Sequence, residues 1–145
     1  MRGLTAQEVE YVAHKLAREW MKWNEPIPDF GTRFPNVLES CLAMPFHSFG
    51  GKSAYKGLIG KASILFYLMI KNHPFKNGNK RIAMTALMTF LYKNNKWIKV
   101  DDVEFYNFAK WVAESGPKYK AEAVSAIEKF IKTYMVNLSD IGSDD

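Results

Sequence analysis

Residues 56–93 read KGLIGKASILFYLMIKNHPFKNGNKRIAMTALMTFLYK and contain two strongly apolar segments on either side of a short polar loop. In 56–72 the apolar side chains recur at helical spacing and cover much of a helix surface, which predicts a central, largely buried helix. In 79–93 they fall on one face, which predicts a second core helix that ends near Asn94. Pro74 limits the extent of the first helix, because a proline cannot continue the hydrogen-bonded ladder.

The other segments also read as helices with short connections. Thr5 and Glu8 form a capping-box pattern at the start of a first helix, which ends before Pro26. Asp101 or Asp102 caps a later helix. We therefore predict an all-α fold, a compact bundle of about six helices (with room for a small hairpin). The remaining expected elements are a short helix at 36–42, a hairpin-like connection at 44–55, an extended piece at 97–100 and a last helix at 124–134.

The length and composition favour one ordinary globular domain. With 145 residues, 48% of them hydrophobic, the chain can bury its own core. We assign 1–137 to this domain and expect 138–145 to form a flexible C-terminal tail. The single cysteine, Cys41, excludes an internal disulfide and a cysteine zinc site, and we expect it to be buried. The longest apolar stretch, 62–70, is shorter than the roughly 20 residues of a membrane span, and the first residues lack the pattern of a signal peptide, so we expect the cytoplasm.

The polar loop and the start of the second core helix carry the densest polar cluster of the chain. Gly78 would let a ligand approach the helix N-terminus, where backbone N–H groups and the helix dipole favour an anion. Lys80 and Arg81 lie in the first turn, where a bound polyphosphate would balance their charge. His73 beside this site is suited to remove a proton from a hydroxyl, although an isolated histidine with nearby cations is more often a structural or solvated group.

The string 73–81, HPFKNGNKR, resembles the signature of the Fic/Doc (Fido) family: histidine-x-phenylalanine-x-acid-x-asparagine-lysine/glycine-arginine. The resemblance extends to 36–45, 49–51 and 90–91, and covers residues 5–135. Most members of this family transfer AMP to a protein hydroxyl, whereas the death-on-curing toxins phosphorylate a target, in the known branch a translation elongation factor. The resemblance implies a Fido fold, ATP and Mg²⁺, and a target protein. The family's inhibitory helix motif is not found in this sequence, so the resemblance also implies that a separate antitoxin would supply the inhibition.

Carried onto this sequence, the resemblance makes His73 the general base and Phe75 a structural anchor of the loop. The nucleotide would be held by the residues that follow, namely Asn77, Gly78, Asn79, Lys80 and Arg81. The segment before the first core helix corresponds to the family's flap, which docks an extended target segment by strand pairing. Its residues in this chain are Phe46, Phe49, Gly50 and Gly51.

Two positions favour transfer of phosphate from ATP to a serine or threonine hydroxyl. Lys80 stands where AMP transferases of the family have a glycine, and Met84 stands where they have a second arginine. Asn77 departs from the family, which has an acid at this position to bind magnesium. Because a neutral amide attracts a hard divalent cation less strongly, we expect Asn77 to be a weak ligand and the phosphates to hold most of the Mg²⁺.

Three alternatives remain open. The chain could transfer AMP, it could bind nucleotide with little catalysis because of Asn77, or, with a net charge of +5, it could be a basic module without catalysis. That module would use Lys71, Lys76, Lys80, Arg81, Lys93, Lys96 and Lys99 to bind nucleic acid or an acidic partner. No nucleic-acid-binding motif accompanies these residues, so we do not expect a nucleic-acid partner. His14 and His47 lack the spacing of metal ligands, and we expect both at the surface.

Overall fold

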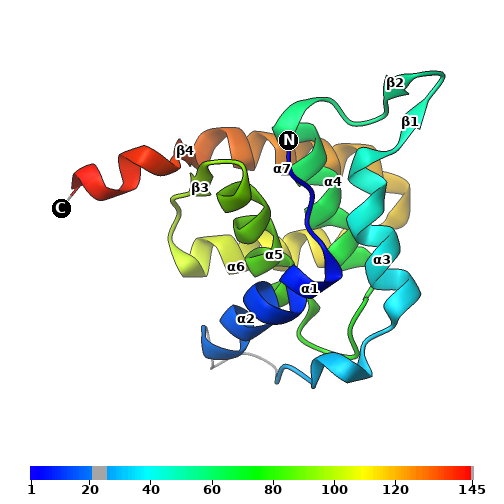
Figure 1. Ribbon diagram of the computed structural model, residues 1–145. Coiled ribbons are helices and arrows are strands. Elements are labelled where there is room, and N and C mark those ends of the chain that lie inside the picture. The colour runs from blue at the N-terminus through cyan, green and yellow to red at the C-terminus, as the bar shows by residue number, and fades with distance from the viewer. Residues whose placement is uncertain (21–25, 145) are drawn as a thin grey trace.

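The computed structural model describes residues 1–20 and 26–144. Helices α4 (Gly57–Lys71) and α5 (Asn79–Lys93) form the centre of the molecule (Figure 1). All residues from 62 to 70 of α4 are buried. In α5 the buried residues also lie on most sides of the helix. A helix that is apolar on nearly all sides is stable only where other elements cover it, which explains the central position of the pair. The two core helices predicted from the sequence are confirmed.

The N-terminal helical segment packs against α5. It consists of α1 (Ala6–Glu8), the π-helix η1 (Val9–His14) and α2 (Lys15–Glu19). The predicted capping box is present: the Glu8 N–H donates to Thr5 Oγ1 at 3.1 Å, and the Thr5 N–H donates to Glu8 Oε1 at 3.0 Å. The six-residue π-helix departs from the regular helix that the spacing predicts.

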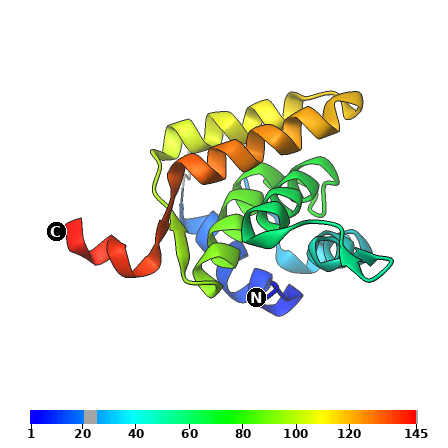
Figure 2. The same ribbon diagram turned by 90° about the horizontal axis from the view of Figure 1, so that it is seen from above.

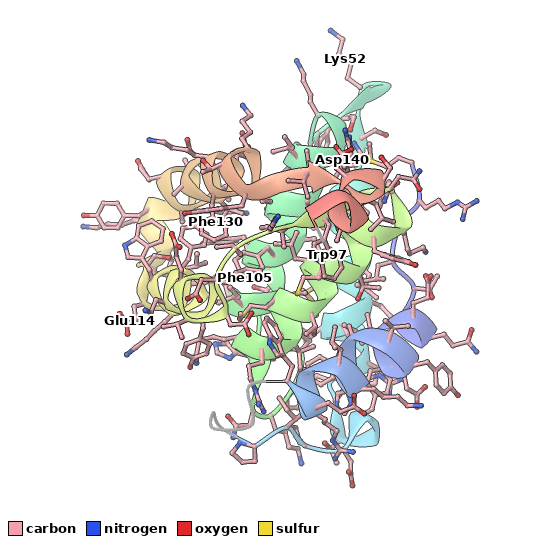
Figure 3. All side chains as sticks on the ribbon, turned by 90° about the vertical axis from the view of Figure 1, so that its left-hand side faces the viewer. Lys52, Trp97, Phe105, Glu114, Phe130 and Asp140 are labelled. Atoms are coloured by element: carbon pink, nitrogen blue, oxygen red, sulfur yellow. The ribbon has the colours of Figure 1, made fainter. Side chains whose placement is uncertain are left out.

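A small hairpin leaves the bundle before α4. Gly50 and Gly51 have φ angles of 59° and 79°, and the register pairs Phe49 with Lys52, so the connection is a two-residue turn of the kind that favours glycine. The hairpin projects from the bundle in Figure 1, and Lys52 lies far from the core in Figure 3. This confirms the hairpin-like connection. The elements of this region are η2 (Phe30–Thr32), α3 (Pro35–Ala43), η3 (Met44–Phe46), β1 (Ser48–Phe49) and β2 (Lys52–Ser53).

Helices α6 (Asp102–Glu114) and α7 (Lys120–Tyr134) form a second layer on one side of the central helices (Figure 2). Asp101 is the N-cap of α6, and its carboxylate accepts two backbone hydrogen bonds from the first turn. Aromatic rings join the layers: the ring centroid of Phe66 in α4 lies 5.9 Å from that of Phe105 in α6, which in turn lies 5.7 Å from that of Phe130 in α7 (Figure 3). This burial fixes the second layer onto the core.

After α7 the chain pairs with the strand that follows α5, and its end then leads away from the bundle (Figures 1 and 2). Strand β4 (Met135–Asn137) pairs antiparallel with β3 (Lys96–Ile98), and the 3-10 helix η5 (Leu138–Asp144) follows. The turn η4 (Pro117–Tyr119) joins α6 to α7. The sequence predicted an extended piece at β3 but no partner for it. The flexibility of 138–145 stays a prediction.

The structure confirms the all-α class, because helices dominate it and the sheets are two-stranded. Within residues 1–20 and 26–144, no helix has the length and apolar character that crossing a membrane requires. Cys41 is buried as expected, and burial raises the pKa of its thiol to about 11.

Candidate functional site

His73 lies on the loop that joins α4 to α5, which we call the motif loop (residues 72–78), and its side chain is exposed. Its backbone has a φ of 50°, in the left-handed region that costs a residue with a Cβ roughly 1–2 kcal/mol. Residues in such conformations cluster at functional sites, where the surrounding structure holds them in place. The backbone geometry is therefore consistent with a functional role for this imidazole.

Phe75 fixes the middle of the motif loop in the core. Its side chain is 1% exposed, and its ring centroid lies 5.8 Å from that of His14 and 5.9 Å from that of Phe30. The backbone makes a second attachment, because the Phe34 N–H donates to the Pro74 carbonyl at 2.9 Å. The predicted role of Phe75 as a structural anchor is confirmed.

Asn79 closes the motif loop from the first residue of α5. Its Oδ1 accepts from the Phe75 N–H at 3.0 Å, and its Nδ2 donates to the Phe75 carbonyl at 2.8 Å. These two bonds fix the orientation of the amide, so the 3.4 Å contact between Nδ2 and His73 Nδ1 directs an N–H toward that ring nitrogen. The contact is long and weak, but it favours the tautomer with its proton on Nε2. The proposed contact of Asn79 with phosphate stays a prediction, and in the free protein this side chain bonds the loop.

Gly78 is the N-cap of α5 and is buried. Its φ is 73°, and a Cβ at this position would lie 2.3 Å from Cδ1 of Ile27. Both features require glycine: the left-handed backbone disfavours a side chain, and Ile27 occupies the space that a side chain would need. The start of α5 therefore lies under the segment that contains Ile27.

The two predicted cations differ in their surroundings. Lys80 is half-buried in the first turn of α5. Arg81 is only 3% exposed, and its guanidinium donates to the Trp20 carbonyl at 3.2 Å. The sequence predicted that both cations hold phosphate; in the structure the second one is buried beside the end of the N-terminal helix. Phosphate binding by either residue stays a prediction.

The described residues offer few ligands for a metal ion at this site. Among the residues that the structure describes, no group of three or more His, Cys, Asp or Glu side chains could hold one. Asn77, half-buried in the motif loop, brings a neutral amide oxygen. Hard divalent cations prefer carboxylates, so this donor set fits an ion that arrives on a nucleotide better than a resident metal.

The predicted flap residues occupy two different places. Phe49 is 74% exposed and lies on the hairpin beside Gly50 and Gly51. Phe46 lies in η3, before the hairpin, where its ring packs edge-on against Phe90 of α5 at 6.3 Å. The hairpin is therefore present as expected, while its use in docking a target stays a prediction.

His47 is exposed as expected, but the expectation for His14 is wrong. His14 is 3% exposed, and burial lowers the pKa of its imidazole. Helical spacing groups it with Glu10 and Arg18, four residues before and after it, which predicts a polar face. The π-helix changes that register and turns the ring into the core. No local pattern reveals its contacts with Phe30 and Phe75, which come from distant segments.

A family profile and a known protein match parts of this chain. The profile of the Fic/DOC family matches residues 4–91. A relative, "Toxin Doc" of Mycolicibacterium smegmatis (strain ATCC 700084 / mc(2)155), is 35% identical over 65 residues, which are 45% of this chain and 50% of that protein. The chain thus spans half the length of this relative, and no solved structure matches it. Because the family profile covers more than half of the chain, including the motif loop and the two core helices, the protein belongs to the Fic/DOC family.

Proposed function

We propose that the protein is a Fic/Doc-type toxin that transfers the terminal phosphate of ATP to a serine or threonine hydroxyl of a target protein. The observation that carries this proposal is the placement of His73, an exposed imidazole on a loop that Phe75 and Asn79 fix at the start of α5. The dipole of that helix favours phosphate at this end. The relative named Toxin Doc supports the assignment as a toxin.

In the proposed reaction His73 takes the proton of the target hydroxyl while the hydroxyl oxygen attacks the γ-phosphorus. The new O–P bond forms, the bond between the γ-phosphorus and the β-phosphate oxygen breaks, and ADP leaves. Nδ1 faces Asn79, so Nε2 is the nitrogen available to the hydroxyl. It accepts a proton only in the tautomer that carries hydrogen on Nδ1, so the long contact with Asn79 must give way before transfer.

The nucleotide would bind as MgATP, whose Mg²⁺ would offset part of the charge of the phosphates. Asn77 would offer it one neutral oxygen. Lys80, in the first turn of α5, would add a positive charge toward the phosphates. Arg81 would add a second positive charge, although in the free protein it is buried and one of its guanidinium nitrogens donates to the Trp20 carbonyl.

Two residues of α5 favour phosphate transfer over AMP transfer. Met84, at the position of the second arginine of AMP transferases, is fully buried and belongs to the core. It therefore supplies no positive charge that could bind a second phosphate. Lys80 replaces the glycine beside which the β-phosphate enters in those enzymes. The nucleotide should then bind in the opposite direction, with its γ-phosphate nearest His73.

The partners that we propose follow from the family. They are a target protein, in the known branch a translation elongation factor, and a separate antitoxin that suppresses the toxin. Asn77 favours a second candidate function, a nucleotide-binding protein with weak catalysis, because it replaces the acid that binds magnesium in the family. AMP transfer to the same hydroxyl is the alternative on the same fold.

The proposal is tested by expressing the protein in bacteria and by incubating it with a cell lysate and ATP labelled at the γ-position. Growth arrest and label on a serine or threonine are expected. His73→Ala should abolish both and leave the circular dichroism spectrum unchanged, because an exposed imidazole contributes chemistry rather than packing. Transfer retained in His73→Ala would remove the general-base assignment.

A further inference from the structure

His14 is a buried polar side chain that the proposed reaction does not use. Its Nε2 lies 2.8 Å from the Pro28 carbonyl oxygen. A carbonyl oxygen only accepts, so Nε2 carries the proton and donates it. The bond links the N-terminal helical segment to the segment of residues 26–30, which we call the wall.

The His14 ring also contacts the motif loop. Its ring centroid lies 5.4 Å from that of Phe30 in the wall, in an edge-on arrangement, and 5.8 Å from that of Phe75 in the motif loop. The two phenylalanine rings lie 5.9 Å apart, so the three rings form one cluster. His14 therefore touches both segments at once.

The backbone around His14 is built to hold it there. Within the π-helix η1, the carbonyl of Ala13 accepts a hydrogen bond from Thr85 Oγ1 of α5 at 2.8 Å. Thr85 is fully buried, and π-helical turns are rare and frequent at functional sites. The backbone at Ala13 is thus attached to α5, while the side chain of the next residue, His14, bonds the wall.

The wall and the segment that follows it touch the motif loop at two further points. Ile27 fills the space beside Gly78, and the Phe34 N–H donates to the Pro74 carbonyl. A displacement of the wall would therefore open the side of Gly78 and release the loop that carries His73.

We propose that His14 is a positioning residue for this site. Its Nε2–H bond to Pro28 holds the wall against the motif loop and so keeps His73 and the start of α5 in their relative places. The functional consequence rests on the proposed function, because it concerns group transfer at the loop that carries His73. The mechanical link itself does not depend on the reaction.

Two variants separate the hydrogen bond from the ring. His14→Gln keeps an N–H donor at nearly the position of Nε2 and loses the ring. His14→Phe keeps a ring and leaves the Pro28 carbonyl without its donor. The control is Ile131→Val in α7, a buried position in the second layer that should lower stability without touching the wall.

The first readout is amide hydrogen exchange, resolved by residue with NMR on the full chain. In His14→Phe the Phe34 and Phe75 amides, which bond the motif loop, should exchange about tenfold faster relative to amides of α7, the effect of one lost buried hydrogen bond. His14→Gln should stay within about threefold of the parent. A uniform change across the chain, as expected for Ile131→Val, or equal effects of both His14 variants, would overturn the positioning role.

The second readout is transfer from γ-labelled ATP. His14→Phe should lower kcat about tenfold or more with a smaller change in KM for ATP. His14→Gln should retain most of the parent's kcat. Unchanged kcat in His14→Phe would overturn the proposal. Absence of transfer in the parent would instead remove the proposed function, while the exchange pattern would still decide whether His14 holds the loop.

Discussion

Gly78→Ala should lower the free energy of unfolding by about 1.5–3.5 kcal/mol, because two separate costs meet at this glycine. The φ of 73° costs a residue with a Cβ roughly 1–2 kcal/mol. The new Cβ would also lie 2.3 Å from Cδ1 of Ile27, so that side chain must leave its rotamer, at roughly 0.5–1.5 kcal/mol. Urea denaturation followed by circular dichroism measures the sum.

Other glycines of the chain separate the two costs. Gly57 has a φ of 68° and no described atom within 4 Å of a Cβ, so Gly57→Ala should cost only the roughly 1–2 kcal/mol of backbone strain. Gly31 has neither feature, and Gly31→Ala should be neutral or slightly stabilising. In an Ile27→Ala background, adding Gly78→Ala should cost no more than Gly57→Ala does. If Gly78→Ala costs no more than Gly57→Ala in the parent as well, Ile27 does not pack against the start of α5 and the reasoning is refuted.

Four further predictions concern the motif loop and its support. Phe75→Ala should lower the free energy of unfolding by about 3–5 kcal/mol in the same urea assay, and a loss below 1 kcal/mol would contradict its role as anchor. Lys80→Ala should weaken MgATP binding in isothermal titration calorimetry, whereas an unchanged Kd would place the phosphates elsewhere. Asn77→Asp should raise the rate of label transfer at fixed Mg²⁺, because a carboxylate binds the metal better than an amide, and a slower variant would argue against metal at this position. Burial lowers the pKa of His14 below its ordinary value of 6.5, so the unfolded chain binds the extra proton. Its contribution to stability should be complete above pH about 6.5 and be lost as the pH falls toward the folded-state pKa. Urea denaturation at several pH values should therefore show a free energy of unfolding that falls with pH in this range, and the slope should be smaller in His14→Gln. An equal slope in both proteins would contradict the assignment.

Local patterns were enough to predict the framework of the fold. The apolar periodicity of α4 and α5, the capping box at Thr5, and the aspartate before α6 each act within a few residues, so the sequence reveals them directly. The motif string between the core helices likewise places His73 and Phe75 on one loop. These features needed no knowledge of which distant segments meet.

Contacts between distant segments could not be predicted in this way. Strand β4 pairs with β3 although α6 and α7 lie between them in the sequence, and the helical pattern before Met135 does not indicate this pairing. His14 reads as part of a polar face because α-helical spacing does not anticipate a π-helix. The position of Arg81 in the first turn of α5 does not indicate that its side chain is buried and donates to the Trp20 carbonyl, 61 residues away in sequence. In each case tertiary packing decides the environment, and the local sequence is silent about it.

The most direct test of the proposed reaction is the identity of the group that reaches the target. The protein is incubated with a cell lysate and Mg²⁺, together with ATP labelled separately at the α- and γ-positions, and the modified protein is then identified by mass spectrometry. Lys80 and the buried Met84 predict label from the γ-position only and a mass increase of one phosphoryl group on a serine or threonine. Label from the α-position, with the mass of an AMP group, would contradict phosphate transfer and assign the protein to the AMP transferases.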